Sequence, residues 1–318
     1  MVPLFLTESD VERLLDMPAV IQVVENAFRA LAQGEAENVP RRRCKTSGAI
    51  LHTMSAAANY LGLVGWKQYT TTRQTATFHV GVSDQKTGRL LALMEADRLG
   101  QLRTGATTGV AVKHLAAPAA EEVGILGSGW QAQSQLEAVS VVRPIKTVKV
   151  FSPTRSHRDK FADSMSQKLG IPVTPVSNSK DAVSNVPIVI TATNSATPVL
   201  AGEDVAPGSL VCAMGSNWLH KTEIDEAIMR RAGQIVCDSV EACKLEAGDF
   251  IQALGRGNFD WSRVTELSTI VQANTDHTDS TNQITLFKSV GLAIEDVATA
   301  ALLVNRSHQN HDQTPLTH

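Results

Sequence analysis

The sequence predicts an α/β protein of two domains, on three observations. The first part of the chain reads as a helix followed by strands, because its hydrophobic period changes from helical to alternating. The second part alternates strands and helices, which is typical of a parallel, doubly wound sheet. Near the start of the second part lies a glycine turn, Gly127-Ser-Gly129, with an apolar run before it and a helical pattern after it.

Composition and charge exclude several classes of protein. The 318 residues are 43% hydrophobic and 19% charged, which is enough material for more than one domain. A net charge of -3 gives no basic field for nucleic acid or an anionic membrane. Apolar runs are too short for a membrane span, and the start of the chain does not read as a signal peptide. The four cysteines form no CxxC pair, so we expect reduced thiols, no metal site and a cytoplasmic location.

The elements of the N-terminal part follow from local signals. Thr7 and Asp10 have the spacing of a capping box, and Gly34 is a plausible end for the helix that follows. A turn over residues 84–88 joins the last two of the expected strands. The expected strands are 49–56, 63–72, 75–83 and 89–96, and a helix is expected at 101–116.

The C-terminal part predicts repeated strand–helix units and then one long helix. Its strands are expected at 122–127, 147–151, 171–176, 187–193, 209–215 and 234–239, with helices at 130–142, 156–170 and 223–233. Residues 284–304 read as a single helix with an apolar face, which could pack back on the first domain.

The glycine turn has the spacing and context of a dinucleotide site. Gly127 permits the tight turn, Gly129 lets the backbone approach a pyrophosphate, and Ala132 keeps the helix close to the strand. The helix N-terminus supplies N–H donors for the phosphates. The sequence therefore predicts a Rossmann domain in which Gly127, Ser128, Gly129, Trp130 and Gln131 bind the cofactor.

The end of the second strand of this domain predicts the kind of dinucleotide. An NAD site usually has an acid there for the ribose 2′-hydroxyl, but no acid occurs between Glu137 and Asp159. A guanidinium matches a 2′-phosphate with bidentate hydrogen bonds. We therefore expect NADPH, bound in part by Ser152, Thr154, Arg155 and Arg158, with His157 nearby.

Cations of the first domain predict an anionic substrate. In a strand, Arg41 and Arg43 would share one face, with Arg42 on the other. Lys67 follows a strongly apolar run, and Arg103 lies early in a helix. Arginines suit a carboxylate, and a partly desolvated lysine can donate or accept a proton. Each of these residues is also compatible with an ordinary solvated surface charge.

The chain resembles the ornithine cyclodeaminase/mu-crystallin family over nearly its whole length. The resemblance rests on HTMSAA followed by GWKQY, on ALMEADRLGQLRTGATTGVA, on GILGSGWQAQSQ, on MGSNWLHKTEID and on TLFKSVGLAIEDVATA. It implies a substrate-binding and dimerisation domain over 1–115 with 290–318, a Rossmann NADP-binding domain over 116–289, and a homodimer. Members of the family include ornithine cyclodeaminase, alanine dehydrogenase, reductases of cyclic imino acids and NADPH-binding mu-crystallins.

The resemblance also implies roles for single residues. Lys67 matches the family's active-site lysine, and Arg103 and Arg41 match its carboxylate-binding arginines. Thr104 matches a contact to the cofactor phosphate. Further cofactor or substrate contacts are expected from Tyr69, Thr193, Met214, Asn217, Trp218, Ser289, Val290 and Gly291.

Two positions depart from the cyclodeaminase pattern. Asn217 stands where the cyclodeaminase has an aspartate, and His52 stands where it has a glutamate. Asn cannot accept a proton, so the groups that handle the amine in ornithine cyclisation are missing. His52 is either a proton donor or a hydrogen-bond partner of the site.

These features predict NADPH-dependent reduction of a C=N bond next to a carboxylate. The expected substrate is a cyclic imino acid such as Δ1-pyrroline-2-carboxylate or Δ1-piperideine-2-carboxylate. Arg41 and Arg103 would hold the carboxylate, and Lys67, with His52 as a candidate partner, would keep the imine nitrogen protonated. The alternatives are an alanine dehydrogenase, an ornithine cyclodeaminase, or a protein that only binds NADPH and a small ligand.

Overall fold

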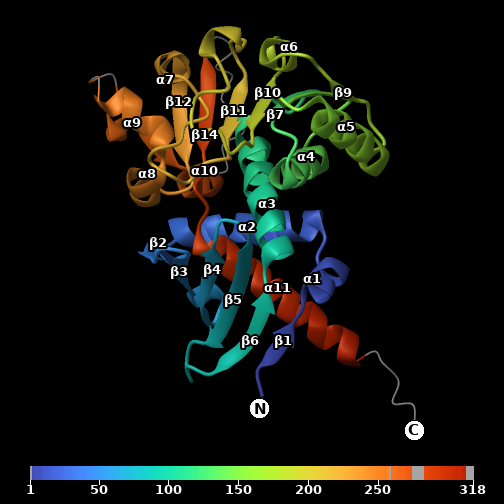
Figure 1. Cartoon of the computed structure of the whole chain (residues 1–318). Coiled ribbons are helices and arrows are strands. Elements are labelled where there is room, and N and C mark those ends of the chain that lie inside the picture. Colours follow the sequence, from blue (N-terminus) through green and yellow to red (C-terminus); the bar gives the residue numbers. More distant parts are fainter. Residues whose placement is uncertain (1, 256, 258, 274–282, 313–318) are drawn as a thin grey trace. The chain divides into compact units, whose positions relative to one another are not determined.

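The structure, a computed structural model, describes residues 2–255, 257, 259–273 and 283–312. The chain divides into two compact units, whose elements are labelled in Figure 1. Unit 1 takes the chain as far as Thr107 and again from Leu292, and unit 2 takes Thr108 to Gly291. The sequence predicted boundaries after residues 115 and 289, whereas this division falls after Thr107 and after Gly291. The assignment of substrate and cofactor binding to the two parts stays a prediction. Residues 313–318 of the expected first domain lie outside the described part.

Unit 1 is built around a six-stranded sheet of order β1-β6-β5-β4-β3-β2. β1 pairs parallel with β6, and the other pairs are antiparallel. The strands are β1 (Leu4–Leu6), β2 (Ala36–Lys45), β3 (Ile50–Ala58), β4 (Leu63–Thr71), β5 (Ala76–Asp84) and β6 (Leu90–Glu95). The helices are α1 (Glu8–Leu14), α2 (Met17–Ala32), the short η1 (Asn59–Leu61), α11 (Ala293–Asp312) and the first part of α3 (Asp97–Leu115), which continues into unit 2.

The local signals of unit 1 act as the sequence predicts. Asp10 Oδ2 accepts hydrogen bonds from the backbone N–H and the hydroxyl of Thr7, at 3.0 and 2.8 Å, which stabilises the start of α1. Gly34, after α2, has φ +73°, and Gly88, in the turn between β5 and β6, has φ +70°. Glycine adopts such angles without the steric cost that other residues pay. The strands β1 and β2 were not among the elements expected by range.

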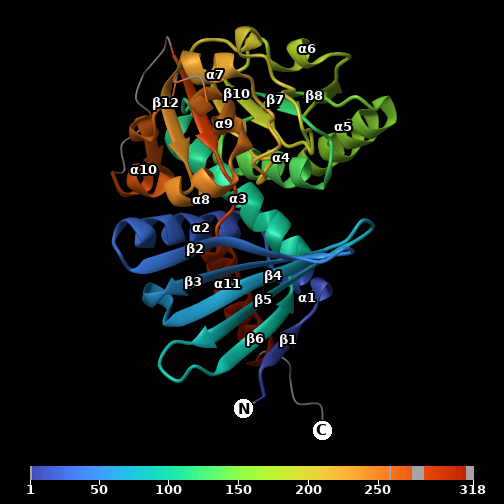
Figure 2. The same cartoon turned by 60° about the vertical axis from the view of Figure 1, so that its left-hand side comes forward.

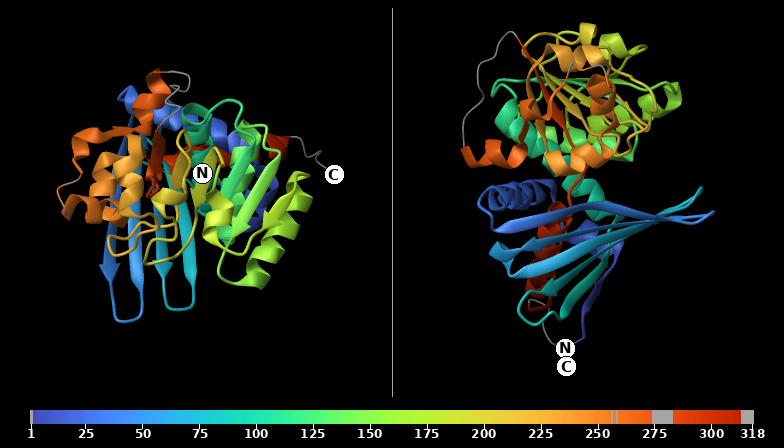
Figure 3. Two further views of the ribbon diagram at one scale, coloured as in Figure 1. Left: turned by 90° about the horizontal axis from the view of Figure 1, so that it is seen from above. Right: turned by 90° about the vertical axis from the view of Figure 1, so that its left-hand side faces the viewer.

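One face of this sheet is covered by α11, which contacts β2 to β5 and also packs against α2, as Figure 2 and the right-hand view of Figure 3 show. On β4, Gly65, Lys67 and Tyr69 are buried on this face, while Val64 and Gln68 are exposed, as a strand's alternation requires. A Cβ on Gly65 would lie 2.7 Å from Val297 Cγ2. Glycine at this position therefore lets α11 approach the strand closely.

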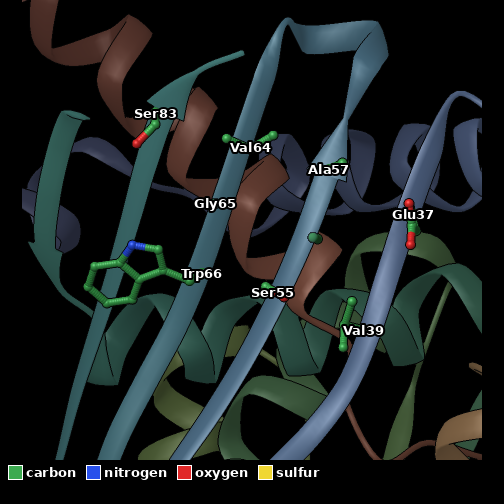
Figure 4. A pocket seen from close by; sticks show the side chains of 9 residues that line it. Glu37, Val39, Ser55, Ala57, Val64, Gly65, Trp66 and Ser83 are labelled. Carbon is green, nitrogen blue, oxygen red and sulfur yellow. The ribbon is translucent and has the colours of Figure 1, made fainter. Parts of the chain in front are cut away.

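The opposite face of the sheet carries a groove of about 320 Å³, shown in Figure 4. Side chains that line it come from β2 to β5 and include Val39, Val64 and Trp66. Val39 and Val64 are 41% and 40% exposed, which is high for apolar side chains on a sheet. None of the residues that line this groove belongs to the site predicted from the sequence.

Unit 2 contains an eight-stranded, all-parallel sheet of order β13-β12-β14-β11-β10-β7-β8-β9. Its strands are β7 (Glu122–Leu126), β8 (Thr147–Phe151), β9 (Val173–Pro175), β10 (Ile188–Thr191), β11 (Leu210–Ala213), β12 (Ala232–Cys237), β13 (Val264–Glu266) and β14 (Ile284–Lys288). Its helices are α4 (Trp130–Val142), α5 (Arg155–Leu169), α6 (Ser179–Val183), α7 (Glu226–Arg231), α8 (Val240–Glu246), α9 (Gly248–Gly255) and α10 (Leu267–Ala273), with short η2 (Gly202–Asp204) and η3 (Trp261–Arg263).

The order of these strands confirms the predicted doubly wound fold. β8 and β9 follow β7 on one side, and β10 and β11 lie on its other side, so the order in which strands are added reverses between β7 and β10. In open parallel sheets, ligands bind outside the carboxyl ends of the strands at such a reversal. The glycine turn after β7 lies at this point.

The prediction of a single helix over residues 284–304 is wrong. Residues Ile284–Lys288 form β14, which lies between β11 and β12, and α11 begins only at Ala293. All five residues of β14 are buried. A strand buried on both faces is a continuous apolar run, which periodicity cannot distinguish from a buried helix. Among the described helices, none has both the length and the apolar character needed to cross a bilayer.

Candidate functional site

Lys67 of β4 lies on the buried face of unit 1, with its side chain 3% exposed. Its Nζ donates a hydrogen bond to Asp296 Oδ1 on α11 at 2.9 Å. Burial lowers the pKa of Lys67 to about 8, and the positive charges of Arg103 and Arg41 add to this, while Asp296 opposes it. A lysine with this pKa can give up and regain a proton near neutral pH.

Arg103 of α3 shares the same carboxylate. Its Nε donates to Asp296 Oδ1 at 3.1 Å, and its Nη1 donates to Glu295 Oε2 at 2.7 Å. Both acids are 0% exposed. A guanidinium has five N–H donors, so these two hydrogen bonds leave further donors for a substrate carboxylate. Thr104 Oγ1 donates to Gly100 O within α3 at 2.7 Å, and its predicted contact to a cofactor phosphate stays a prediction.

The strand register brings four side chains of unit 1 into one row. Arg43 is opposite His52, His52 is opposite Tyr69, and Tyr69 is opposite Phe78. The rings of His52 and Tyr69 stack at 4.0 Å, and those of Tyr69 and Phe78 stack at 5.0 Å. Opposite residues in antiparallel strands lie on the same face, so this flat row follows directly from the pairing.

His52 is a neutral member of this row. Its Nδ1 accepts a hydrogen bond from Arg43 Nε at 3.2 Å, and its Nε2 lies 3.1 Å from Thr71 Oγ1. Burial and the charges of Arg43, Arg41 and Lys45 lower the pKa of His52 to about 4. Because Nδ1 accepts, the ring hydrogen belongs on Nε2, which donates to Thr71. This geometry favours the hydrogen-bonding role for His52 over the role of proton donor.

Arg41 reaches the same face through an irregularity in β2. The pairing of β2 with β3 shifts between Val39 and Arg42, and both Pro40 and Arg41 are buried while Arg42 is exposed. An extra residue in an edge strand turns its side chain toward a new direction. Arg41 Cζ lies 5.9 Å from the centre of the Tyr69 ring. Arg41 and Arg43 therefore face Tyr69 and His52, and Arg42 does not.

In unit 2, the glycine turn after β7 fits a dinucleotide. Gly127 has φ +112°, and a Cβ there would lie 2.3 Å from Ala192 O. Gly129, the residue before α4, has no heavy atom within 4 Å of a Cβ position, and no side chain caps the helix. Ser128 Oγ and Ser152 Oγ lie 2.8 Å apart, which joins this turn to the end of β8. The backbone N–H groups at the helix start and the open space beside them suit a pyrophosphate.

The neighbouring residues of the turn differ in exposure. Trp130, the first residue of α4, is 49% exposed, whereas Ala132 is fully buried. Gln131 is intermediate between them. The burial of Ala132 agrees with the predicted close approach of α4 to β7, and Trp130 and Gln131 stay predicted cofactor contacts.

The basic residues after β8 take different conformations. Thr154 precedes α5, and Arg155 begins it with its side chain 85% exposed, 3.4 Å from Asp159. Arg158 Nη1 instead donates to Ser152 O at 2.9 Å. An exposed ion pair at this distance contributes little stability, so Arg155 can turn toward a ligand at small cost. Arg158 supports the loop that holds Ser152.

The loops after β10 and β11 are held by an acid that sequence reasoning missed. Glu223 is 0% exposed, and its Oε1 accepts hydrogen bonds from Thr193 N at 2.7 Å and Thr193 Oγ1 at 2.8 Å. Its Oε2 accepts from Gly215 N at 2.6 Å. Met214, between these strand ends, is buried. Thr193 and Met214 therefore lie at the carboxyl edge of the sheet, where the sequence predicts the cofactor.

A second buried acid, Asp238, organises the loop after β14. Its Oδ2 accepts hydrogen bonds at 2.7 Å from Ser289 Oγ, Val290 N and Gly291 N. This loop is the one that the sequence predicts beside the nicotinamide. Since one carboxylate oxygen takes all three donors, the loop has a defined conformation before any ligand binds.

The loop that carries Asn217 is anchored by a buried ion pair. Lys288 is 0% exposed; its Nζ lies 2.7 Å from Asp249 Oδ2 and donates to Ser216 O at 2.8 Å. Asn217 itself is half-buried.

Among the described residues, no group of His, Cys, Asp and Glu side chains could hold a metal ion.

Sequence reasoning missed five buried residues that hold the predicted site residues or their loops: Glu223, Asp238, Lys288, Glu295 and Asp296. Each is nearly or fully buried, and three of them, Lys288, Glu295 and Asp296, lie in a largely apolar run. Buried charges need a partner, so charged residues inside an apolar pattern were the available signal for these three. The partners themselves come from distant segments, as with Lys67 and Asp296, and could not be read from the sequence.

Comparison of the sequence with family models shows to which family the chain belongs. The model of the ornithine cyclodeaminase/mu-crystallin family matches residues 1–311. The chain belongs to this family. The resemblance drawn from the quoted motifs is thereby confirmed.

Members of the family with known names are similar over most of their length. A Δ1-pyrroline-2-carboxylate reductase of Bacillus cereus is 36% identical over 236 residues, which are 74% of this chain and 72% of the relative. The structure of Thermococcus litoralis Δ1-pyrroline-2-carboxylate reductase with NADH and L-proline has a TM-score of 0.92 and 33% identity, and covers 97% of this chain and 98% of that one. An archaeal alanine dehydrogenase dimer with bound NAD has a TM-score of 0.91 and 30% identity, and covers 98% of each chain.

These similarities confirm the predicted fold, and the oxidoreductase class predicted from the sequence is the class of these relatives. The two structures hold NADH and NAD, so a nicotinamide dinucleotide is the cofactor of both.

Proposed function

We propose that this protein reduces a cyclic imino acid of the Δ1-pyrroline-2-carboxylate or Δ1-piperideine-2-carboxylate type to the L-amino acid, with NADPH. The observation that carries the proposal is the buried Lys67, whose pKa of about 8 suits proton donation, on the same face as Arg41 and close to Arg103. Similarity to Δ1-pyrroline-2-carboxylate reductases supports the choice of substrate.

The two arginines are the groups of unit 1 best suited to the substrate carboxylate. Arg103 is held by Glu295 and Asp296 with donors to spare. Arg41 lies over the Tyr69 ring. Tyr69 is stacked against both His52 and Phe78, so the side chain that lies near Arg41 is itself held in place.

Lys67 supplies the proton that the reduction needs. An iminium accepts hydride more readily than a neutral imine, so a protonated Lys67 beside the nitrogen favours the step. The bound nicotinamide supplies the hydride to the imine carbon. The nitrogen keeps the proton, the C=N bond becomes a C–N single bond, and the products are the secondary amine and the oxidised dinucleotide.

The residues of unit 2 that would hold the cofactor are Gly127, Ser128 and Gly129 at the pyrophosphate, and Ser289 to Gly291 beside the nicotinamide. NADPH is favoured over NADH because Thr154 and the exposed Arg155 follow β8, with no acid between Glu137 and Asp159. The two related structures hold NADH and NAD, so the preference of this protein is tested by comparing its KM for NADPH with its KM for NADH.

Asn217 and His52 argue against ornithine cyclisation. An amide at position 217 cannot take a proton, and His52 is neutral and committed to Arg43 and Thr71. Reductive amination of a 2-oxo acid, the activity in the name of the archaeal relative, uses the same kinds of groups and is the second candidate.

We further propose a homodimer that uses the open face of the unit 1 sheet. The groove there exposes Val39 and Val64, and a relative of 30% identity is a dimer. The free thiols, three of them buried, also agree with a cytoplasmic protein, which stays a prediction.

One set of assays separates the candidate functions. NADPH absorbance is followed with Δ1-pyrroline-2-carboxylate, then with pyruvate and ammonia or methylamine, and NAD reduction is followed with ornithine. We expect the highest kcat/KM with the cyclic imine. Micromolar NADPH binding without turnover of any substrate would favour a carrier of NADPH and a small ligand.

The variant Lys67→Met tests the role of the lysine. We expect turnover to be lost and dinucleotide affinity to be unchanged, since Lys67 is not among the residues that we propose to hold the cofactor. Full activity of this variant would remove Lys67 from the reaction.

A further inference from the structure

The first turn of α11 carries two adjacent acids, Glu295 and Asp296, that contact the cations of unit 1 described above. Asp296 Oδ1 accepts hydrogen bonds from both Lys67 Nζ and Arg103 Nε, at 2.9 and 3.1 Å. Glu295 Oε2 accepts from Arg103 Nη1 at 2.7 Å. Asp296 thus connects the lysine of β4 with the arginine of α3.

The burial of this cluster makes its charges interact strongly. Lys67 is 3% exposed, Arg103 is 8% exposed, and Asp296 is 0% exposed. Burial alone disfavours an ammonium, because water no longer solvates it. A carboxylate within hydrogen-bond distance restores part of the lost stability of the charged form.

The charged groups that face Lys67 come from three elements. Arg41 from β2 and Arg103 from α3 lower its pKa, and Asp296 from α11 raises it. On α3, a Cβ added to Gly100 would lie 2.8 Å from Lys67 Nζ. The backbone of α3 therefore lies close to the ammonium on one side, and Asp296 accepts its hydrogen bond from another element.

We propose that Asp296 is a positioning residue that keeps Lys67 protonated and directed for proton donation, while Glu295 positions Arg103. This inference rests on the proposed imine reduction for its catalytic meaning. The ion pair itself stands on the geometry of unit 1. Asp296 thereby contributes both to proton donation by Lys67 and to the position of Arg103, whereas Glu295 contributes to the position of Arg103.

The sign of the expected effect follows from the charges. The protonated lysine is the active form, so turnover falls as pH rises through the pKa of Lys67, about 8 in the native chain. Asp296→Asn keeps an acceptor oxygen and removes the negative charge. With Arg41 and Arg103 still present, the pKa falls further, by about 1–3 units for a close opposite charge. The decline in turnover then begins at lower pH.

The first experiment compares Asp296→Asn with the matched control Glu295→Gln over pH 5 to 10, with Δ1-pyrroline-2-carboxylate and NADPH. For Asp296→Asn we expect the alkaline limb of kcat to move down by about one unit or more, together with a raised KM. For Glu295→Gln we expect a raised KM and a limb at the native pH. An unmoved limb in Asp296→Asn, or equal movement in both variants, overturns the proposal.

The second experiment keeps the inference separate from the proposed function. The Lys67 Nζ resonance is followed by 15N NMR in the ligand-free protein and assigned by its loss in Lys67→Met. We expect a lower pKa in Asp296→Asn than in the native chain, and an unchanged pKa overturns the pairing. If the native protein reduces no imine, the proposed function fails while this titration still decides the pairing.

A third variant covers the case in which Asp296→Asn does not fold. Gly100→Ala places a methyl group against Lys67 Nζ, at the flexible end of a side chain, and alanine is favoured over glycine within a helix. We expect a stable protein in which Nζ is displaced from Asp296 and titrates at lower pH. A native Lys67 pKa in Gly100→Ala contradicts the proposal.

Discussion

Substitution by alanine should have different effects at the two glycines of the turn after β7: loss of stability at Gly127 and loss of dinucleotide affinity at Gly129. In Gly127→Ala the new Cβ would lie 2.3 Å from Ala192 O, in a residue with φ +112°. In Gly129→Ala the new Cβ meets no heavy atom within 4 Å, and no positive φ opposes it. The first substitution therefore damages the fold, and the second enters only the space that we assign to the pyrophosphate.

The magnitudes separate the two variants clearly. A non-glycine residue at a positive φ costs about 1–3 kcal/mol, and overpacking against backbone adds about 1–3 kcal/mol. At about 2–4 °C for each kcal/mol, Gly127→Ala lowers Tm by roughly 10 °C. Gly129→Ala lowers the free energy of unfolding by about 1 kcal/mol or less, because alanine is a poorer residue than glycine before a helix. Its dinucleotide affinity falls by about tenfold or more, which corresponds to about 1.4 kcal/mol.

Thermal unfolding without ligand and fluorescence titration with NADPH measure these two effects independently. The expected result is a low Tm for Gly127→Ala, and a nearly native Tm with weak binding for Gly129→Ala. Native affinity in Gly129→Ala would show that the space before α4 does not receive the cofactor. A native Tm in Gly127→Ala would refute the steric reasoning at β10.

Three further predictions concern charge and assembly. The pKa of His52 is about 4 in the native state against an ordinary value of 6.5, so the unfolded state binds the proton more readily and the free energy of unfolding falls as pH drops from 6.5 toward 4. His52→Gln should reduce this pH dependence of the free energy of unfolding, measured by urea titration at each pH. An unchanged dependence would assign it to other groups. Arg155→Glu should raise KM for NADPH at least about tenfold more than KM for NADH, and equal effects would remove Arg155 from the phosphate site. Val64→Glu should give monomers in sedimentation velocity, whereas the similarly exposed Val141→Glu in unit 2 should not; a dimeric Val64→Glu would place the interface elsewhere.

The parts of the fold that could be predicted are those whose sequence signal is local. The turn with Gly88 and the glycine turn after β7 depend on residues within a few positions of each other. β14 could not be predicted, because its identity as a strand comes from its neighbours β11 and β12. A short run buried on every side carries no period that could reveal which element it forms.

The site shows the same division between local and distant causes. Lys67 was visible because an apolar run leads directly to a charge, and its partner Asp296 lies 229 residues away. The predicted common face of Arg41 and Arg43 agrees with the structure, although a shift in β2 pairing, which no local pattern announced, sets the direction of Arg41.

The pKa of Lys67 depends on this distant partner, so the chemistry of the site belongs to the fold and not to the motif. GWKQY supplies a lysine, and burial beneath α11 and α3 lowers its pKa. Without Asp296 the same burial, together with Arg41 and Arg103, would favour a neutral amine that has no proton to donate. A family member that kept the lysine motif and replaced this aspartate with a neutral residue should therefore retain its substrate arginine and lose proton donation at neutral pH.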